Sequence, residues 1–129
     1  MIEVGLNAEI ETIVTDNDTA AFYGSGLVNV LSTPRIVSLL EGAAVEAIKN
    51  NLASGETSVG TLINIEHIAP TPVGMKVWAS AKLIRVDGRR LIFEVLARDE
   101  VEQVARGTHE RFIVNFDRFI KKAEKKKSF

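Results

Sequence analysis

The chain has 129 residues, 46% of them hydrophobic and 26% charged, which suits one globular domain with a buried core. Its net charge of −1 argues against a general polyanion binder, and the lack of cysteine excludes disulfides, thiol catalysis and cysteine-ligated zinc. No apolar run approaches the ~20 residues that span a bilayer, and the N-terminus lacks a signal peptide's basic start and apolar stretch. The expected location is therefore the cytoplasm, with no membrane partner.

The first third of the chain contains a strand pattern followed by a helix pattern. Residues 9–15 alternate between polar and apolar side chains, which predicts a strand. Residues 16–18 form a polar turn that can cap a short helical piece through Phe22. A long helix is then expected from Pro34 to about Leu52, because Thr33 can serve as its N-cap and proline suits the first helical position.

Beyond this helix the hydrophobic period changes to two, which predicts consecutive antiparallel strands. The expected strands are 57–68, 75–83, 91–97 and 104–116, with a hairpin turn at Asp87-Gly88. One face of the first of these strands is expected to carry Val59, Thr61, Ile63, Ile65 and His67. One long helix against one antiparallel sheet gives an α+β fold, with residues 1–129 as a single domain.

The C-terminus, from about residue 117, is locally basic and is expected to form a short amphipathic or frayed helix. Such a lysine run is more typical of a solvated tail than of a binding patch, and by itself it does not predict nucleic-acid binding. The clustered lysines are Lys121, Lys122, Lys125, Lys126 and Lys127.

Glu41 is out of place on the long helix. At 100° per residue it shares a face with Val37, Ala44, Val45 and Ile48, well away from the helix's polar side. A carboxylate on an apolar stripe is costly to bury unless it is paired, hydrogen-bonded or protonated. Glu41 is thus either a catalytic base or an interface residue that bonds a backbone group.

His67 and Thr33 add to this possibility. The strand alternation points the ring of His67 toward the helix layer, and Thr33 lies at a helix N-terminus, where developing negative charge is stabilised. Singly, His67 is explained as a satisfied core residue and Thr33 as an N-cap. Together, Thr33, Glu41 and His67 form a plausible set of nucleophile, base and acid.

Two further residues are unusual for strands. Gly60 sits inside a strand, where glycine marks either a bulge or a close backbone approach, such as a backbone N–H aimed at a thioester oxygen. Arg111 lies in a densely charged segment, which either an exposed edge strand or contacts to coenzyme phosphates would explain.

Five short sequence motifs occur together in this chain in a characteristic combination. They are Ser32-Thr33-Pro34, Leu39-Leu40-Glu41, Ser58-Val59-Gly60-Thr61, the segment from His67 to Gly74, and Gly107-Thr108-His109-Glu110-Arg111. The combination resembles the fluoroacetyl-CoA-specific thioesterase-like branch of the hot-dog superfamily, from about Leu31 to Val114.

This resemblance implies a hot-dog fold, in which a sheet wraps a long helix, and a homodimer whose sheets join, with active sites between subunits. It matches Thr33 to an active-site hydroxyl, Glu41 to the catalytic carboxylate and His67 to the catalytic histidine. Gly60 matches a residue whose backbone N–H contacts the thioester carbonyl, and Arg111 matches an arginine lining the site.

The segment before Thr33 departs from the family pattern. The fluoroacetate-specific member is marked by a lid of aromatic residues there, whereas this chain has Gly24, Gly26 and Leu27, with Phe22 and Tyr23 slightly earlier. The expected substrate is therefore a short or medium acyl-CoA rather than fluoroacetyl-CoA.

The leading hypothesis is an acyl-CoA thioesterase acting as a homodimer, or as a tetramer made of two such dimers. The alternatives are a non-catalytic acyl-CoA or small-ligand binding protein and, with less support, a hot-dog hydratase or dehydratase. His67 and His109 have no neighbours at ligand-like spacing, so no metal site is expected. CoA enters as part of the substrate and no cofactor is expected.

Overall fold

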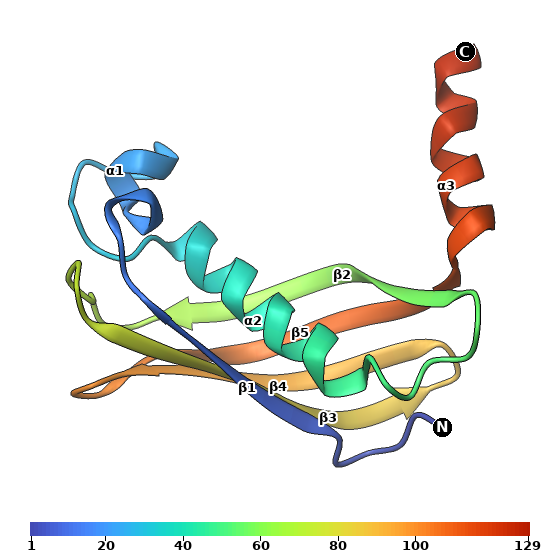
Figure 1. The fold of residues 1–129 in the computed structure, drawn as a ribbon, viewed down its shortest axis with the longest axis horizontal. Coiled ribbons are helices and arrows are strands. Elements are labelled where there is room, and N and C mark those ends of the chain that lie inside the picture. The colour runs from blue at the N-terminus through green and yellow to red at the C-terminus, as the bar shows by residue number, and fades with distance from the viewer.

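A computed structural model describes all residues, 1–129, and contains one five-stranded antiparallel sheet with a long helix on one face (Figure 1). The strand order is β1-β3-β4-β5-β2, so β1 and β2 are the two edges of the sheet. This confirms the expected α+β fold. The strands are β1 (Asn7–Ile13), β2 (Glu56–His67), β3 (Lys76–Asp87), β4 (Arg90–Asp99) and β5 (Gln103–Asn115).

The long helix α2 (Thr33–Ile48) differs from its prediction at both ends. Its N-cap is Ser32, whose Oγ accepts a hydrogen bond from the backbone N–H of Arg35, so the prediction that Thr33 caps the helix is wrong. The helix also ends four residues before Leu52. Asn50 and Asn51, which follow it, are weak helix formers, because their side chains compete for backbone hydrogen bonds.

Small side chains let α2 approach the sheet closely. A Cβ at Gly42 would lie only 3.2 Å from the Cδ1 atom of Ile10 on β1. The residues that α2 buries against the sheet are Ile36, Leu39, Leu40, Ala43, Ala44, Ala47 and Ile48. They meet the inner face of the sheet, whose buried apolar residues include Leu83, Leu91 and Phe93.

A β-bulge interrupts the pairing of β2 with β5. Gly60 pairs with Arg111 and Leu62 pairs with Glu110, which leaves Thr61 as the extra residue. Since directly paired residues share a face, Val59, which pairs with Phe112, lies on the outer face of the sheet, opposite to Ile63 and His67. The prediction that Val59 and His67 share one face is therefore wrong, because the bulge shifts the alternation by one residue.

The start of α2 is anchored by the short 3-10 helix η1 (Asp16–Asp18). The Asp18 carboxylate accepts hydrogen bonds from the backbone N–H and the hydroxyl of Thr15, and from Nε of Arg35 at 2.8 Å. Burial opposes ionisation of Asp18, but these hydrogen bonds outweigh it and lower its pKa. Asp18 thus ties the N-terminal segment to the first turn of α2.

Three shorter elements complete the chain: α1 (Ala20–Tyr23), α3 (Phe116–Glu124) and η2 (Lys125–Ser128). Asn115 caps α3 by accepting from the N–H of Arg118. The helix expected near the C-terminus is thereby confirmed, and it stands away from the sheet on the same side as α2, with none of its residues buried (Figure 1). None of the helices combines the length and apolar composition that crossing a bilayer requires.

Candidate active site

Thr33 and His67 meet where the start of α2 lies over the end of β2. The Thr33 Oγ1 atom is 2.7 Å from His67 Nδ1, so the ring faces the helix layer as the strand alternation predicted. Because Ser32 provides the helix cap, the Thr33 hydroxyl is available for this contact.

The environment of His67 favours its neutral form. Its Nε2 atom is buried and has no hydrogen-bond partner. Burial lowers the pKa of His67, and the nearby backbone of Ala69 offsets only part of this effect. A neutral imidazole beside a hydroxyl can accept its proton, which is the arrangement of a nucleophile with a general base.

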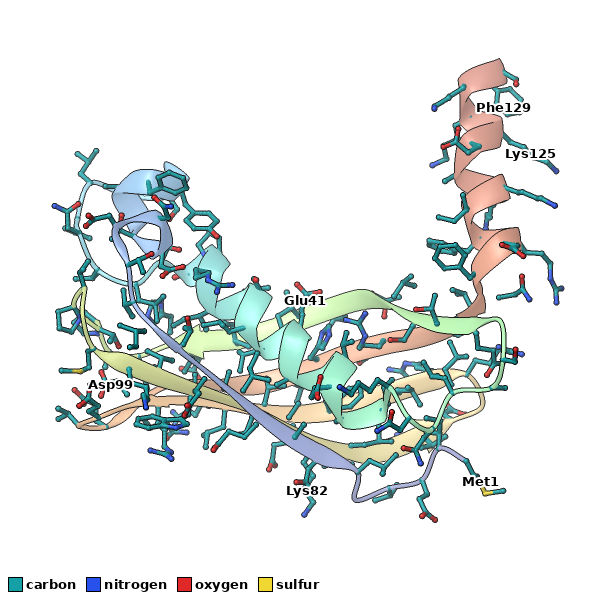
Figure 2. The ribbon with its side chains drawn as sticks, in the orientation of Figure 1. Met1, Glu41, Lys82, Asp99, Lys125 and Phe129 are labelled. Atoms are coloured by element: carbon teal, nitrogen blue, oxygen red, sulfur yellow. The ribbon has the colours of Figure 1, made fainter.

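Glu41 lies between α2 and β2, and its carboxylate lies over the backbone of Gly60 (Figure 2). A Cβ at position 60 would be only 2.7 Å from Glu41 Oε2, so the close approach requires glycine. Gly60 thus begins the bulge and also lies close to a side chain, whereas a contact of its N–H with a thioester oxygen stays a prediction. The Glu41 side chain is 39% exposed in the single chain, because the face of α2 toward the free edge of β2 is uncovered.

Arg111 reaches the same cluster from β5. Its Nη1 atom lies 3.8 Å from Glu41 Oε2, while Nε and Nη2 donate to the hydroxyl and carbonyl oxygens of Ser58 at 2.8 and 3.0 Å. The side chain is only 7% exposed, and burial lowers the pKa of Arg111 while Glu41 opposes the shift. An exposed edge strand does not explain Arg111, because β5 is an interior strand of the sheet.

The single chain brings these five residues into two clusters. One is the Thr33–His67 pair and the other contains Glu41, Gly60 and Arg111. Thr33 and Glu41 are eight residues apart on α2, which corresponds to about 12 Å along the helix axis. A site that uses both clusters of one chain would have to span this distance.

Two residues that contact the second cluster were missed from sequence. Ser58 holds Arg111, and the buried ring of His109 also contacts it, with Nε2 3.1 Å from Arg111 Nη1. The alternation along β5 puts His109 and Arg111 on one face, which was the available signal.

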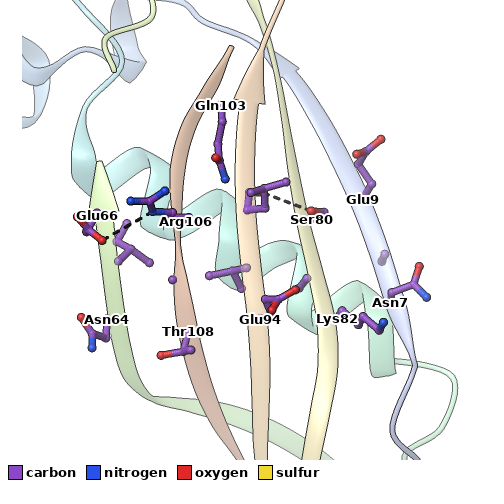
Figure 3. Close-up of a pocket in the computed structure, with 16 residues that line it drawn as sticks. Asn7, Glu9, Asn64, Glu66, Ser80, Lys82, Glu94, Gln103, Arg106 and Thr108 are labelled. Atoms are coloured by element: carbon purple, nitrogen blue, oxygen red, sulfur yellow. Dashed lines mark hydrogen bonds and ion pairs between the residues drawn. The ribbon is translucent and has the colours of Figure 1, made fainter. Parts of the chain in front are cut away.

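A large hollow lies elsewhere, on the outer face of the sheet, opposite to α2 (Figure 3). Its volume is about 900 Å³, and none of the five predicted site residues lines it. Acidic and basic side chains alternate there, with Glu9, Glu66 and Glu94 beside Lys82 and Arg106. The two clusters together hold a hydroxyl, an imidazole and a carboxylate, whereas no imidazole lines this hollow. No three His, Asp or Glu side chains converge as a metal site.

Comparison with known proteins supports a common architecture and chemistry. Residues 14–117 match the family described as fluoroacetyl-CoA-specific thioesterase. The fluoroacetyl-CoA thioesterase of Streptantibioticus cattleyicolor is 41% identical over 97 residues, which cover 75% of this chain and 70% of that protein.

Solved structures extend the likeness to nearly the whole chain. The structure of the fluoroacetyl-CoA thioesterase FlK aligns with a TM-score of 0.91 and 34% identity over 98% of both chains. A hot-dog-like protein from Thermanaerovibrio acidaminovorans aligns with a TM-score of 0.88 and 27% identity, covering 97% of this chain and 93% of that one. These likenesses confirm the expected hot-dog fold.

Proposed function

The chain belongs to the fluoroacetyl-CoA-specific thioesterase family and is a thioester hydrolase, and we propose that it acts on short or medium acyl-CoA. The reaction takes an acyl-CoA and water to a carboxylic acid and free CoA. The observation that carries the proposal is the hydroxyl of Thr33 at 2.7 Å from a neutral, partly buried His67, at the N-terminus of a helix. This contact supports Thr33 as nucleophile and His67 as base, at a helix end where developing negative charge is stabilised.

The two clusters supply the groups that thioester hydrolysis needs. His67 takes a proton from Thr33 or from a water and returns it to the leaving thiolate, while the Gly60 N–H and the start of α2 hold the oxyanion. Each oxyanion donor contributes about 2.7–4 kcal/mol in enzymes where it has been removed. Two routes fit these residues: attack by Thr33 or Glu41 to form a covalent intermediate, or attack by a water that Glu41 or His67 activates.

We further propose that the active form is a homodimer joined through β2. This strand is an edge of the sheet, and every residue from Gly60 to Asn64 is exposed, including the apolar Leu62 and Ile63. A long exposed apolar edge strand is a template for pairing with another strand. Antiparallel pairing of two β2 strands about a twofold axis brings the Thr33–His67 end of one strand toward the Gly60 end of the other.

A mixed-dimer experiment tests whether one site uses both chains. Thr33→Val and Glu41→Gln subunits, each inactive alone, are combined after mild denaturation and refolding. If Thr33 of one chain acts with Glu41 of its partner, each mixed dimer contains one intact site, and about a quarter of the wild-type activity returns. No recovery in confirmed mixed dimers would show that each site lies within one chain.

Acyl selectivity follows from the segment that leads into Thr33. Gly24, Gly26 and Leu27 present no aromatic ring there, and Leu27 is 99% exposed. We propose that the enzyme does not discriminate strongly for fluoroacetyl-CoA. The test is kcat/KM for fluoroacetyl-CoA against acetyl-, butyryl- and hexanoyl-CoA; a preference of several hundredfold for the fluorinated substrate would contradict the proposal.

We place the enzyme in the cytoplasm, as one thioesterase domain over residues 1–129 with a basic C-terminal segment from about 117. The support is the cysteine-free composition, which fits a reducing compartment. Fractionation of cells that express the tagged protein tests the location, and recovery with the membranes or outside the cell would contradict it.

A further inference from the structure

The helices α1 and α3 stand at opposite ends of the molecule, both on the α2 side of the sheet (Figure 1). Each belongs to a segment with exposed apolar side chains. The α3 face consists of Phe116, Phe119 and Ile120, whose spacing places them on one side of that helix. The α1 patch consists of Phe22, Tyr23, Leu27 and Val28, all of them exposed. Exposed apolar patches of this kind mark interaction sites on soluble proteins.

The free edge of β2 connects these two ends. Asn115, which precedes α3, pairs with Glu56 at the start of β2, whereas His67 at the end of β2 contacts Thr33, which follows the α1 patch. A twofold axis perpendicular to the sheet keeps both α2 helices on one face and reverses the direction of the second β2. The α3 face of one protomer then comes beside the α1 patch of the other.

The charge distribution favours the same contact. Residues 116–129 contain six Lys or Arg and two Asp or Glu, a net charge of +4. Because the whole chain carries −1, the remaining residues carry −5. A basic helix that projects from an acidic body is attracted to the acidic body of a second copy.

We propose that α3 packs its apolar face on the α1 patch of a second copy and so covers the segment leading to that copy's Thr33. This inference rests on the proposed homodimer. It makes the C-terminal helix a part of the neighbouring active site, and it accounts for a helix that has no fully buried residue in its own chain.

Cysteine cross-linking tests the contact, because the natural chain has no cysteine. Phe119→Cys and Tyr23→Cys subunits are mixed and mildly oxidised, and a disulfide-linked pair of the two variants is expected. The matched control combines Phe119→Cys with Val4→Cys, another exposed position, and it should cross-link poorly.

Sedimentation of the wild-type protein separates the two levels of the proposal. A dimer that forms no Phe119–Tyr23 link above the control overturns this inference and leaves the homodimer standing, whereas a monomer overturns both. Wild-type binding to phosphatidylserine vesicles that is lost in Phe119→Glu, without any cross-link, would show that a lipid surface is the occupant.

A second, independent observation concerns His109, whose side chain is fully enclosed. Its Nδ1 atom lies 2.8 Å from the carbonyl oxygen of Leu62, which can only accept, so Nδ1 carries the hydrogen. Nε2 is then an acceptor, and Arg111 Nη1 donates to it at 3.1 Å. The same Nη1 lies 3.8 Å from Glu41, so a continuous chain joins the bulge in β2 to the catalytic carboxylate.

We infer that His109 is a positioning residue: in its Nδ1–H tautomer it holds the bulge beside Gly60 and aims Arg111 at Glu41. The charged groups nearest to it are Arg111 on β5 and Glu41 on α2, while Glu110, the next residue on β5, points to the opposite face of the sheet. The ring of Phe93 on β4 stacks on it at 6.2 Å. If both ring nitrogens carried hydrogens, Nε2 would face Arg111 as a second donor and this hydrogen bond would be lost.

Two amide variants separate the two bonds of His109. In His109→Gln the terminal amide lies near the position that Nε2 has in the wild type, so its oxygen can accept a hydrogen bond from Arg111. In His109→Asn the amide lies near the position of Nδ1, so it keeps only the hydrogen bond to Leu62. We expect kcat to fall on the order of tenfold more in His109→Asn than in His109→Gln, with KM little changed.

Equal activity of the two folded variants would overturn the assignment. The tautomer gives a measurement that needs no variant. Nitrogen NMR of the wild-type protein should show His109 protonated at Nδ1 and unprotonated at Nε2, and the reverse tautomer would contradict the inference.

Discussion

The Thr33 hydroxyl lies 2.7 Å from His67 Nδ1, while its neighbour Ser32 caps α2. The two adjacent residues therefore carry separate roles, one chemical and one structural. Thr33→Val removes the hydroxyl with little change of shape, and we expect kcat to fall at least about a hundredfold with the helix still capped. Ser32→Ala should instead cost about 1 kcal/mol of unfolding free energy and leave most of the activity. Steady-state kinetics and urea unfolding of both variants measure these effects. A loss of activity in Ser32→Ala and a loss of stability in Thr33→Val would contradict the two roles.

Gly60→Ala should lower the activity strongly while it changes the stability little. The added Cβ would lie 2.7 Å from Glu41 Oε2, so the carboxylate must move. Because the carboxylate is the end of a flexible side chain, we expect a loss of activity of on the order of a hundredfold with less than about 1 kcal/mol lost in stability. The control is Gly42→Ala on α2, next to Ile10 and away from Gly60, which should keep its kcat.

Stability should fall as the pH falls below the ordinary histidine range. Burial lowers the pKa of both His67 and His109 below 6.5 in the folded protein, whereas the unfolded chain keeps ordinary values. The unfolded state then binds more protons below about pH 6.5, so the free energy of unfolding decreases on acidification until the folded pKa values are reached. Urea unfolding at pH 7.5, 6.5 and 5.5 measures this. A free energy that stays constant or rises toward pH 5.5 would contradict it, and His109→Gln should show a smaller decrease.

Asp18→Asn tests the anchor of the active-site helix. The substitution keeps the shape but removes the charge that Arg35 and Thr15 stabilise, and the carboxylate has little exposure. We expect a loss of about 2 kcal/mol in unfolding free energy at pH 7, in the range of hydrogen bonds to charged groups. Glu11→Gln, at an exposed ion pair on β1, is the control and should change stability by less than about 1 kcal/mol. Equal effects of the two substitutions would show that Asp18 anchors nothing.

The sequence predicted most elements and the inward direction of His67, because helical and strand periods differ and were well separated along the chain. It misplaced the helix cap, since Ser32 and Thr33 are chemically equivalent as caps and only the fold chooses between them. Gly60 raised the possibility of a bulge, but the sequence did not decide for it, because one extra residue leaves regular alternation on both sides. The tie between His109 and Leu62 joins residues 47 positions apart, which local patterns do not report.

The central claim is that this chain hydrolyses acyl-CoA with Glu41 as an essential group. The most direct measurement is release of free thiol from acetyl-, butyryl-, hexanoyl- and octanoyl-CoA by the wild-type protein and by Glu41→Gln. We expect turnover of at least one of these substrates by the wild type and a loss of at least about a hundredfold in the variant. Full activity in Glu41→Gln would remove Glu41 from the mechanism, and no turnover of any acyl-CoA by the wild type would contradict the account.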